Sequence, residues 1–198
     1  MIKKIVAIGP ESTGKSMLCK QLAQHFNTMW CPEYAREYLH QNGIKYSYAD
    51  LKKIAEGQLM IEDYCAEEVN NQYSIINNQS AKQSSQLTAH NAQLLFIDTN
   101  MYVMKVWYEY VFGRCEYFVL DEIAARNYDL YLLCNIDLPW IEEPMREYPD
   151  EQPRIELYNI YKDLLINQTT FWVEISGNYK ERLQKAIDAV NTFVRSEM

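Results

Sequence analysis

The sequence predicts an α/β protein in which helices sandwich a parallel sheet of about five strands, with a small lid. Apolar runs of strand length alternate with segments of helical periodicity, which is typical of this class. A glycine-rich loop lies between the first strand and the first helix. The 198 residues suffice for one buried core but not for two ordinary domains, so we expect residues 1–198 to form a single domain.

Apolar segments of strand length recur along the chain. The predicted strands are Lys3–Gly9, Thr28–Cys31, Leu94–Asp98, Tyr128–Cys134 and Phe171–Ile175. Short apolar runs bounded by turn residues indicate strands buried inside a parallel sheet. Segments with apolar residues at helical spacing lie between them. The predicted helices are Lys15–Phe26, Tyr34–Gln41, Tyr48–Val69 and Lys180–Val194.

One polar segment interrupts this pattern. Residues 70–91 are rich in Asn, Gln and Ser. This composition predicts a polar insert, either a mobile surface loop or a frayed extension of the preceding helix.

Charge and composition exclude several classes of function. The net charge of −8 argues against a general nucleic-acid binder, which needs a basic face. No apolar run approaches the length of a membrane-spanning helix. The five cysteines are scattered without a CxxC pair, which predicts free thiols in a reducing compartment. We therefore expect a cytoplasmic protein with no nucleic-acid or membrane partner.

The segment after the first strand matches the phosphate-binding pattern G-x-x-x-x-G-K-[ST]. It reads Gly9, Pro10, Glu11, Ser12, Thr13, Gly14, Lys15 and Ser16. Its glycines let the backbone N–H groups and the helix N-terminus approach phosphate. Lys15 is expected to reach the β- and γ-phosphates and Ser16 to bind Mg²⁺. The loop predicts a P-loop NTPase fold in which all of these residues except Pro10 bind ATP.

Two acidic residues compete for the metal side of the site. Asp98 ends a predicted strand, whereas Asp121 and Glu122 follow Phe118–Leu120. The apolar spacing around Asp121 is helical, so we expect Asp121 and Glu122 on a solvated helix face. Asp98 lies at a strand's carboxyl end, where ligands gather in open α/β sheets. It would hold Mg²⁺ through water or accept a substrate hydroxyl, and the sequence leaves both roles open.

Glu33 and Arg36 follow the second predicted strand, where small-molecule kinases of this layout bind the acceptor. Because they are three residues apart, they share one face of a helical turn. The carboxylate would orient the acceptor hydroxyl or take its proton, and the arginine would hold charge. A surface ion pair is the alternative interpretation.

Residues 137–154 form the predicted lid. The segment contains four prolines together with Trp140, Arg146 and Arg154. Arginines on such a segment would close over the transferring phosphate and exclude water. Trp140 would either stack on a substrate ring or pin the segment to the core.

The ordered set GPESTGKS, PEYAREY, EGQLMIEDY and LFIDTN, followed by this lid, resembles the ribosylnicotinamide kinase domain of NadR-type proteins. The resemblance covers nearly the whole chain. Taken singly, only the phosphate loop is a specific motif, but the ordered set of motifs is far more specific. It implies a P-loop kinase that phosphorylates the 5′-hydroxyl of nicotinamide riboside with ATP and Mg²⁺, giving nicotinamide mononucleotide.

The resemblance also implies residue roles. The family pattern falls on Glu33, Tyr34, Arg36, Glu37, Asp98, Thr99, Trp140, Arg146 and Arg154. By analogy, Tyr34 and Trp140 would flank the cationic nicotinamide ring. Lys15, Arg146 and Arg154 would stabilise the phosphoryl charge, while Glu33 or Asp98 orients the hydroxyl.

Three features depart from the family. Bifunctional relatives carry an N-terminal adenylyltransferase domain and some a DNA-binding helix-turn-helix, and neither is expected here because the sequence begins at the phosphate-loop strand. Residues 70–91 are longer than expected, and Asn100 replaces an acidic residue that often follows the Asp-Thr pair.

The alternatives are a kinase for another nucleoside and an ATP-binding regulatory module. A GTPase is less favoured, because N-K-x-D and D-x-x-G signatures are missing. An ABC-type ATPase lacks its L-S-G-G-Q stretch. The sequence does not predict the oligomeric state.

Overall fold

A computed structural model describes residues 2–79, 93–144 and 146–196. Its sheet has five parallel strands in the order β2-β3-β1-β4-β5. The strands are β1 (Lys3–Ile8), β2 (Met29–Cys31), β3 (Leu94–Asp98), β4 (Leu130–Cys134) and β5 (Trp172–Ile175). The predicted α/β class and parallel sheet are confirmed.

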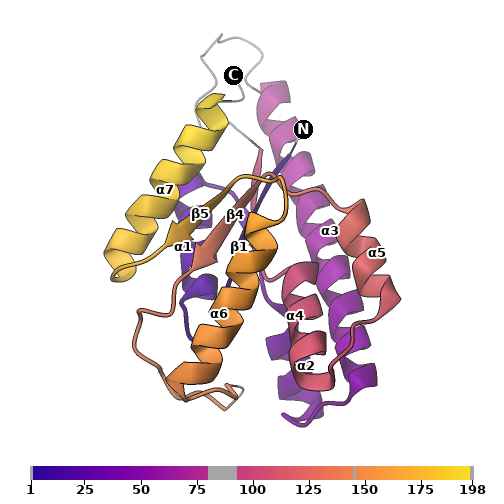
Figure 1. Ribbon diagram of the computed structural model, residues 1–198. Helices are drawn as coiled ribbons and strands as arrows, with labels where there is room; N and C mark the ends of the chain where they lie inside the picture. The colour runs from indigo at the N-terminus through magenta and orange to yellow at the C-terminus, as the bar shows by residue number, and fades with distance from the viewer. Residues whose placement is uncertain (1, 80–92, 145, 197–198) are drawn as a thin grey trace.

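Helices cover both faces of the sheet (Figure 1). They are α1 (Lys15–Phe26), α2 (Tyr34–Asn42), α3 (Tyr48–Gln79), α4 (Met101–Phe112), α5 (Tyr117–Ala125), α6 (Glu151–Ile166) and α7 (Tyr179–Ser196). Helices α1 and α7 pack on one face, and α3, α4 and α6 pack on the other. Helices α2 and α5 lie outside this second layer, in a third apolar cluster with α3 and α4.

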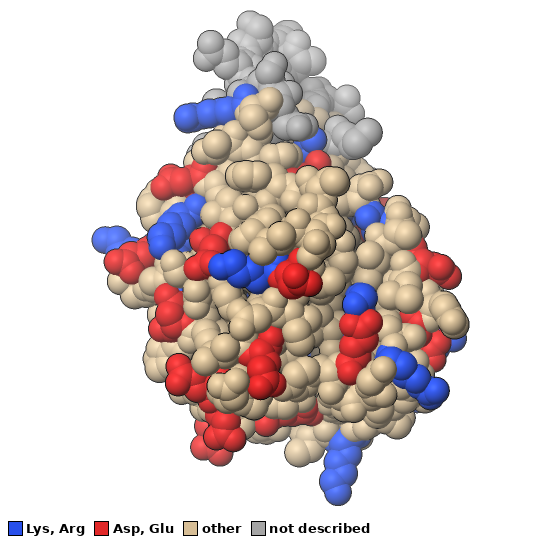
Figure 2. Space-filling model, in the orientation of Figure 1, with Lys and Arg blue, Asp and Glu red and all other residues tan. Residues whose placement is uncertain are grey.

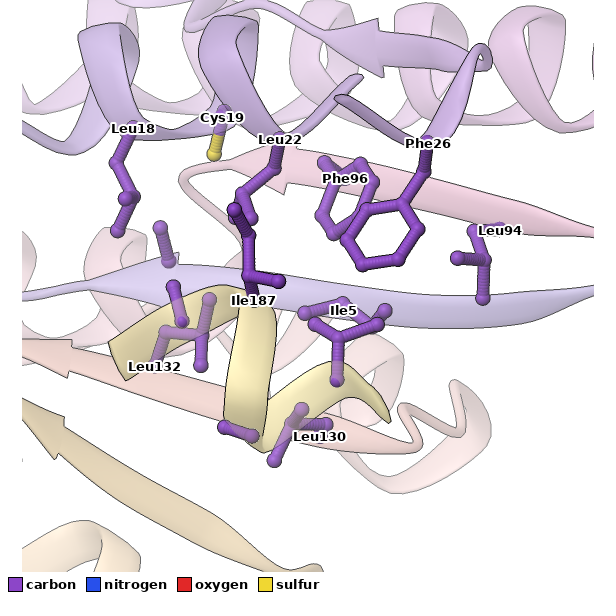
Figure 3. Packing of buried hydrophobic residues seen from close by; sticks show 14 of the residues in the cluster. Ile5, Leu18, Cys19, Leu22, Phe26, Leu94, Phe96, Leu130, Leu132 and Ile187 are labelled. Carbon is purple, nitrogen blue, oxygen red and sulfur yellow. The ribbon is translucent and has the colours of Figure 1, made fainter. Parts of the chain in front are cut away.

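Residues 5–8 of strand β1 are fully buried because helices pack on both faces of the strand. Ile5 points into the cluster of α1 and α7, whereas its neighbour Val6 points into the cluster of α3, α4 and α6. Figure 3 shows Ile5 close to Leu22 of α1 and Ile187 of α7. This two-sided burial explains why residues 5–8 of β1 are apolar without alternation.

The parallel arrangement brings the carboxyl ends of the strands to one edge of the sheet. The phosphate loop follows β1, Glu33 follows β2, and Asp98 ends β3. The segment predicted as a lid follows β4 at the same edge. Residues from distant parts of the sequence therefore meet there.

Several boundaries differ from the sequence-based predictions. Helix α3 continues to Gln79, so residues 70–79 of the predicted polar insert are helical, while residues 80–91 lie outside the described residues. Residues 151–154 of the predicted lid form the first turn of α6. Asp121 and Glu122 lie on α5, as the helical spacing predicted.

Two global predictions can be compared with the structure. None of the described helices is long and apolar enough to cross a membrane. All five cysteines are free thiols, in agreement with the prediction. On the face shown in Figure 2, basic and acidic side chains are interspersed.

Candidate active site

The phosphate loop turns tightly against the end of β4. Gly9 has φ 138° and Gly14 has φ 80°, values that favour glycine. A Cβ on Gly9 would lie 2.7 Å from the carbonyl oxygen of Cys134. Ser12 also adopts a positive φ of 58°. These positive φ values bend the backbone tightly between the end of β1 and the first turn of α1.

The N-terminus of α1 opens directly from this loop. Gly14 is its N-cap, and no side chain caps the helix. The first backbone N–H groups are therefore available to an anion, at the positive end of the helix dipole. The Lys15 ammonium donates to the carbonyl oxygen of Pro10 at 2.9 Å, so its charge lies over the loop. Both features suit the phosphates of a nucleotide.

Asp98 is completely buried at the end of β3. Neither of its carboxylate oxygens has a hydrogen-bond partner among the described residues, and the same holds for the Thr99 hydroxyl. Burial, followed by repulsion from Glu33, raises the pKa of Asp98 to about 7, while the Lys15 charge opposes this shift. Buried oxygens without partners fit a role in holding a cation or a hydrogen-bond donor.

A cavity of about 590 Å³ extends from the phosphate loop to helices α2, α4 and α6. We call the part formed by α2 with the preceding Glu33, α4 and α6 the acceptor end. It is lined by Glu33, Arg36, Leu39, Val106, Trp107 and Tyr161. This volume and the mixture of apolar and charged walls are typical of a small-molecule site. The structure thus brings Lys15, Ser16, Glu33, Arg36 and Arg146 to one cavity.

The segment before α6 is held over the phosphate loop. The Glu11 carboxylate accepts the N–H groups of Glu147 (2.9 Å) and Tyr148 (2.5 Å). The Ser12 hydroxyl oxygen accepts the Ile141 N–H and an Arg146 guanidinium N–H, both at 3.1 Å. Burial raises the pKa of Glu11, although the two N–H groups act in the opposite direction. Side chains of the phosphate loop therefore hold the segment that the sequence predicts as a lid.

Arg154 and Trp140 lie apart from the lining of the cavity. Arg154 is buried and donates to the carbonyl oxygens of Ile136 (3.3 Å) and Leu138 (3.5 Å). The guanidinium groups of Arg146 and Arg154 lie 5.8 Å and 5.4 Å from the centroid of the Trp140 ring. Arg154 belongs to the first turn of α6, so its hydrogen bonds hold the chain that follows β4 against this helix.

Tyr34 is also directed away from the cavity. Its ring lies over Gly57 of α3, where an added Cβ would come within 2.1 Å of a Tyr34 ring carbon. Its backbone N–H donates to the Gln58 side chain at 2.8 Å. The structure therefore does not bring Tyr34 or Trp140 to the acceptor end, where the sequence-based prediction placed them.

Sequence reasoning missed the aromatic side chains that do line the cavity. They are Trp107, Tyr110, Tyr148, Tyr161 and Tyr179. Trp107 and Tyr110 belong to α4, which begins at Met101, three residues after Asp98. Their position just after a strand's carboxyl end was the signal that could have identified them.

Arg182 of α7 is a further residue near the site that the sequence analysis did not identify. It is buried, and donates to the carbonyl oxygens of Thr13 (3.0 Å) and Asn135 (2.8 Å). It also forms an ion pair with Asp137. A single guanidinium thus fixes the phosphate loop against the segment that leaves β4.

A family model described as an AAA domain matches residues 4–182. The chain belongs to this AAA domain family. The AAA domain protein is 26% identical to the trifunctional NAD biosynthesis/regulator protein NadR of Escherichia coli (strain K12), over 96% of this chain and 42% of that protein. The NadR of Salmonella typhimurium is 25% identical over the same shares. The resemblance to NadR-type proteins is confirmed, and the chain spans less than half of these relatives.

Solved structures agree with the fold of this AAA domain. A NadR protein in complex with NR superimposes with a TM-score of 0.69, at 23% identity, over 97% of this chain and 49% of that one. Thymidylate kinase from Ehrlichia chaffeensis gives a TM-score of 0.56 at 10% identity, over 96% and 98% of the two chains. The fold is therefore that of P-loop kinases.

Proposed function

We propose that the chain transfers the γ-phosphoryl group of ATP to the 5′-hydroxyl of nicotinamide riboside. The observation that carries this proposal is a single cavity that joins a phosphate loop to an acceptor end with a carboxylate, Glu33. The choice of acceptor is supported by the NadR relatives and by the NadR structure that holds NR, which we take to be nicotinamide riboside. The products would be ADP and nicotinamide mononucleotide.

The phosphate side of the reaction is assigned to the loop and the lid. Backbone N–H groups at the start of α1 would bind the phosphates. Lys15 would neutralise charge on the β- and γ-phosphates, and Arg146 would approach the transferring group from the lid. We assign no catalytic role to Arg154, because it donates to the carbonyl oxygens of Ile136 and Leu138 and does not line the cavity.

Glu33 is assigned to the acceptor hydroxyl, because its side chain lines the cavity. It would accept the proton of the 5′-hydroxyl while that oxygen attacks the γ-phosphorus. The bond between the γ-phosphorus and the bridging oxygen then breaks, and ADP leaves with the electron pair. The sequence left Glu33 and Asp98 as alternatives for this role, and the burial of Asp98 favours Glu33.

Ser16 and Asp98 would hold Mg²⁺, which when bound would neutralise charge on the β- and γ-phosphates. The unpartnered oxygens of Asp98 support this assignment. Asp98 also lies close enough to Lys15 and Ser16 for both to lower its pKa.

The acceptor end suits a cationic ring. Trp107 and Tyr161 provide aromatic surface, and Glu33 provides negative charge. A pyridinium ring is attracted by aromatic faces and by carboxylates. We therefore assign the nicotinamide ring to these residues in place of Tyr34 and Trp140.

The test is incubation with ATP, Mg²⁺ and a panel of nucleosides that includes nicotinamide riboside. We expect ADP and a monophosphate to form in equal amounts, fastest with nicotinamide riboside. If only a different nucleoside is phosphorylated, that nucleoside is the acceptor and nicotinamide riboside is not. Tight ATP binding with only slow, acceptor-independent hydrolysis would instead favour a regulatory module.

A further inference from the structure

Glu143 of the lid contacts arginines from two different parts of the cavity. One carboxylate oxygen accepts a hydrogen bond from Arg36 of α2 at 2.9 Å. The other accepts one from Arg146 at 2.7 Å. Arg146 in turn donates to the Ser12 hydroxyl oxygen of the phosphate loop at 3.1 Å. A continuous chain of polar contacts therefore leads from the acceptor end to the phosphate loop.

A second chain of contacts runs in parallel through Glu147. The Trp107 indole N–H donates to the Tyr46 hydroxyl oxygen at 2.8 Å. The Tyr46 hydroxyl donates to the Glu147 carboxylate at 2.9 Å. The Glu147 backbone N–H donates to the Glu11 carboxylate at 2.9 Å. This path also begins at a residue of the acceptor end and ends in the phosphate loop.

The first path includes Arg146, which we assign to the transferring phosphoryl group, and holds its side chain through Glu143. The Arg146 side chain is only 15% exposed, and Glu143 is 34% exposed. Charge-assisted hydrogen bonds in partly desolvated surroundings, such as that between Glu143 and Arg146, are stronger and more directional than surface ion pairs. The Arg36 side chain is 53% exposed, so its pair with Glu143 is the weaker link of this path. Because Glu143 holds Arg146 and Arg36 at once, it relates the position of the lid arginine to that of α2.

We propose that Glu143 is a positioning residue that couples acceptor binding to the placement of Arg146 at the phosphate loop, with Glu147 acting in parallel. The inference rests on the proposed function. An acceptor that contacts Arg36 and Trp107 orders one end of both paths. The lid then loses less conformational freedom when ATP binds, so each substrate strengthens the binding of the other.

The test measures the affinity for a non-hydrolysable ATP analogue with and without nicotinamide riboside. In the wild type the acceptor should tighten analogue binding by about tenfold, a common size for coupling between sites. In Glu143→Gln this ratio should fall towards one, although the affinity for the analogue alone changes little. The kcat should fall by about tenfold or more, because a misplaced Arg146 stabilises the transferring group poorly.

Glu142→Gln is the matched control. Glu142 is the exposed neighbour of Glu143 and forms no ion pair among the described residues, so its variant should keep both the ratio and kcat. Glu143→Asp, which retains the charge with a shorter reach, should restore part of the ratio. If Glu143→Gln did not fold, Arg36→Gln would remove the same contact from α2 and should also lower the ratio when nicotinamide riboside saturates that variant.

The outcomes separate this inference from the proposed function. An unchanged ratio in Glu143→Gln, or an equal loss in Glu142→Gln, would overturn the positioning role. The same conclusion would follow from a wild type that phosphorylates nicotinamide riboside but shows no coupling. If the wild type neither bound nor phosphorylated nicotinamide riboside, the proposed function itself would be wrong.

Discussion

Glu33 and Asp98 are close enough to influence each other electrostatically, yet their surroundings suit different roles. Glu33 lines the cavity and is partly exposed, so a substrate hydroxyl can reach it. Asp98 has no exposed surface and lies near Lys15 and Ser16. We therefore assign proton transfer to Glu33 and the metal side to Asp98.

The Glu33→Gln substitution tests this division of roles. The amide keeps the size of the side chain but cannot accept the hydroxyl proton, so kcat should fall by about 100-fold or more. The affinity for ATP should be retained, because Glu33 belongs to the acceptor end. Steady-state kinetics and nucleotide titration measure both quantities. Glu67→Gln, an exposed substitution on α3, serves as the control, and full activity in Glu33→Gln would exclude Glu33 as the base.

At the scale of elements, α2 is set against α3 by the contact of Tyr34 with Gly57. A Cβ on Gly57 would lie between 2.1 and 2.5 Å from three ring carbons of Tyr34. The absence of a side chain therefore allows α2 to approach closely. Since Glu33 and Arg36 lie at the start of α2, this contact also determines where they meet the cavity.

Gly57→Ala should destabilise the fold by about 1–3 kcal/mol, although alanine is ordinarily the better residue inside a helix. The collision with Tyr34 is the reason. The free energy of unfolding in urea measures the effect. In a Tyr34→Ala background the same substitution should become neutral or stabilising, and a penalty that persists there would show that Tyr34 is not its cause.

Glu62 connects three elements through a buried carboxylate. It accepts hydrogen bonds from Lys4 (2.7 Å), Arg126 (3.2 Å) and Tyr128 (2.9 Å), and its side chain has no exposed surface. The ion pairs of this carboxylate hold α3 against β1 and against the end of α5.

Glu62→Gln should lower the free energy of unfolding by about 3 kcal/mol, because Lys4 loses its carboxylate partner and Arg126 loses one of three, the buried one. Asp63→Asn gives the comparison, since Asp63 is 56% exposed and its pairing with Arg126 is expected to contribute about 1 kcal/mol at most. Chemical denaturation of both variants measures the difference. If both variants lost the same free energy of unfolding, the burial of Glu62 would not explain the cost of replacing it.

The sequence predicted those elements whose pattern is local. Strand β3 is a run of buried apolar residues, and the helical spacing around Asp121 correctly placed it on α5. The positions of Trp140 and Arg154 could not be predicted, because they depend on where α6 begins and what it packs against. Tyr34 belongs to a recognisable motif, but its direction is determined by Gly57, more than twenty residues away in the sequence.

At the scale of the whole molecule, one sheet edge brings together groups from the entire chain. Arg182, near the C-terminus, contacts Thr13 in the phosphate loop. Glu147 of the lid contacts Glu11 in the same loop. Because so many elements converge on the loop, nucleotide binding should stabilise the whole fold and not only the site.

ATP with Mg²⁺ at about 100 times its Kd should stabilise the wild type by about 2.7 kcal/mol. Lys15→Ala should show little of this stabilisation at the same concentration, since the ammonium that neutralises the phosphates is lost. Lys20→Ala, at an exposed position on α1, should respond like the wild type. Thermal unfolding with and without nucleotide provides the comparison, and an undiminished response in Lys15→Ala would contradict the binding mode.

The proposed reaction forms a bond between the γ-phosphorus and the 5′-oxygen of the nucleoside, so both of its products should be measured together. The purified chain is incubated with ATP, Mg²⁺ and nicotinamide riboside, and ADP and nicotinamide mononucleotide are quantified together. We predict that they appear in a one-to-one ratio, and that a 5′-deoxy analogue of the nucleoside yields neither above the acceptor-free rate. ADP formation that is the same with and without nicotinamide riboside would contradict the proposed activity.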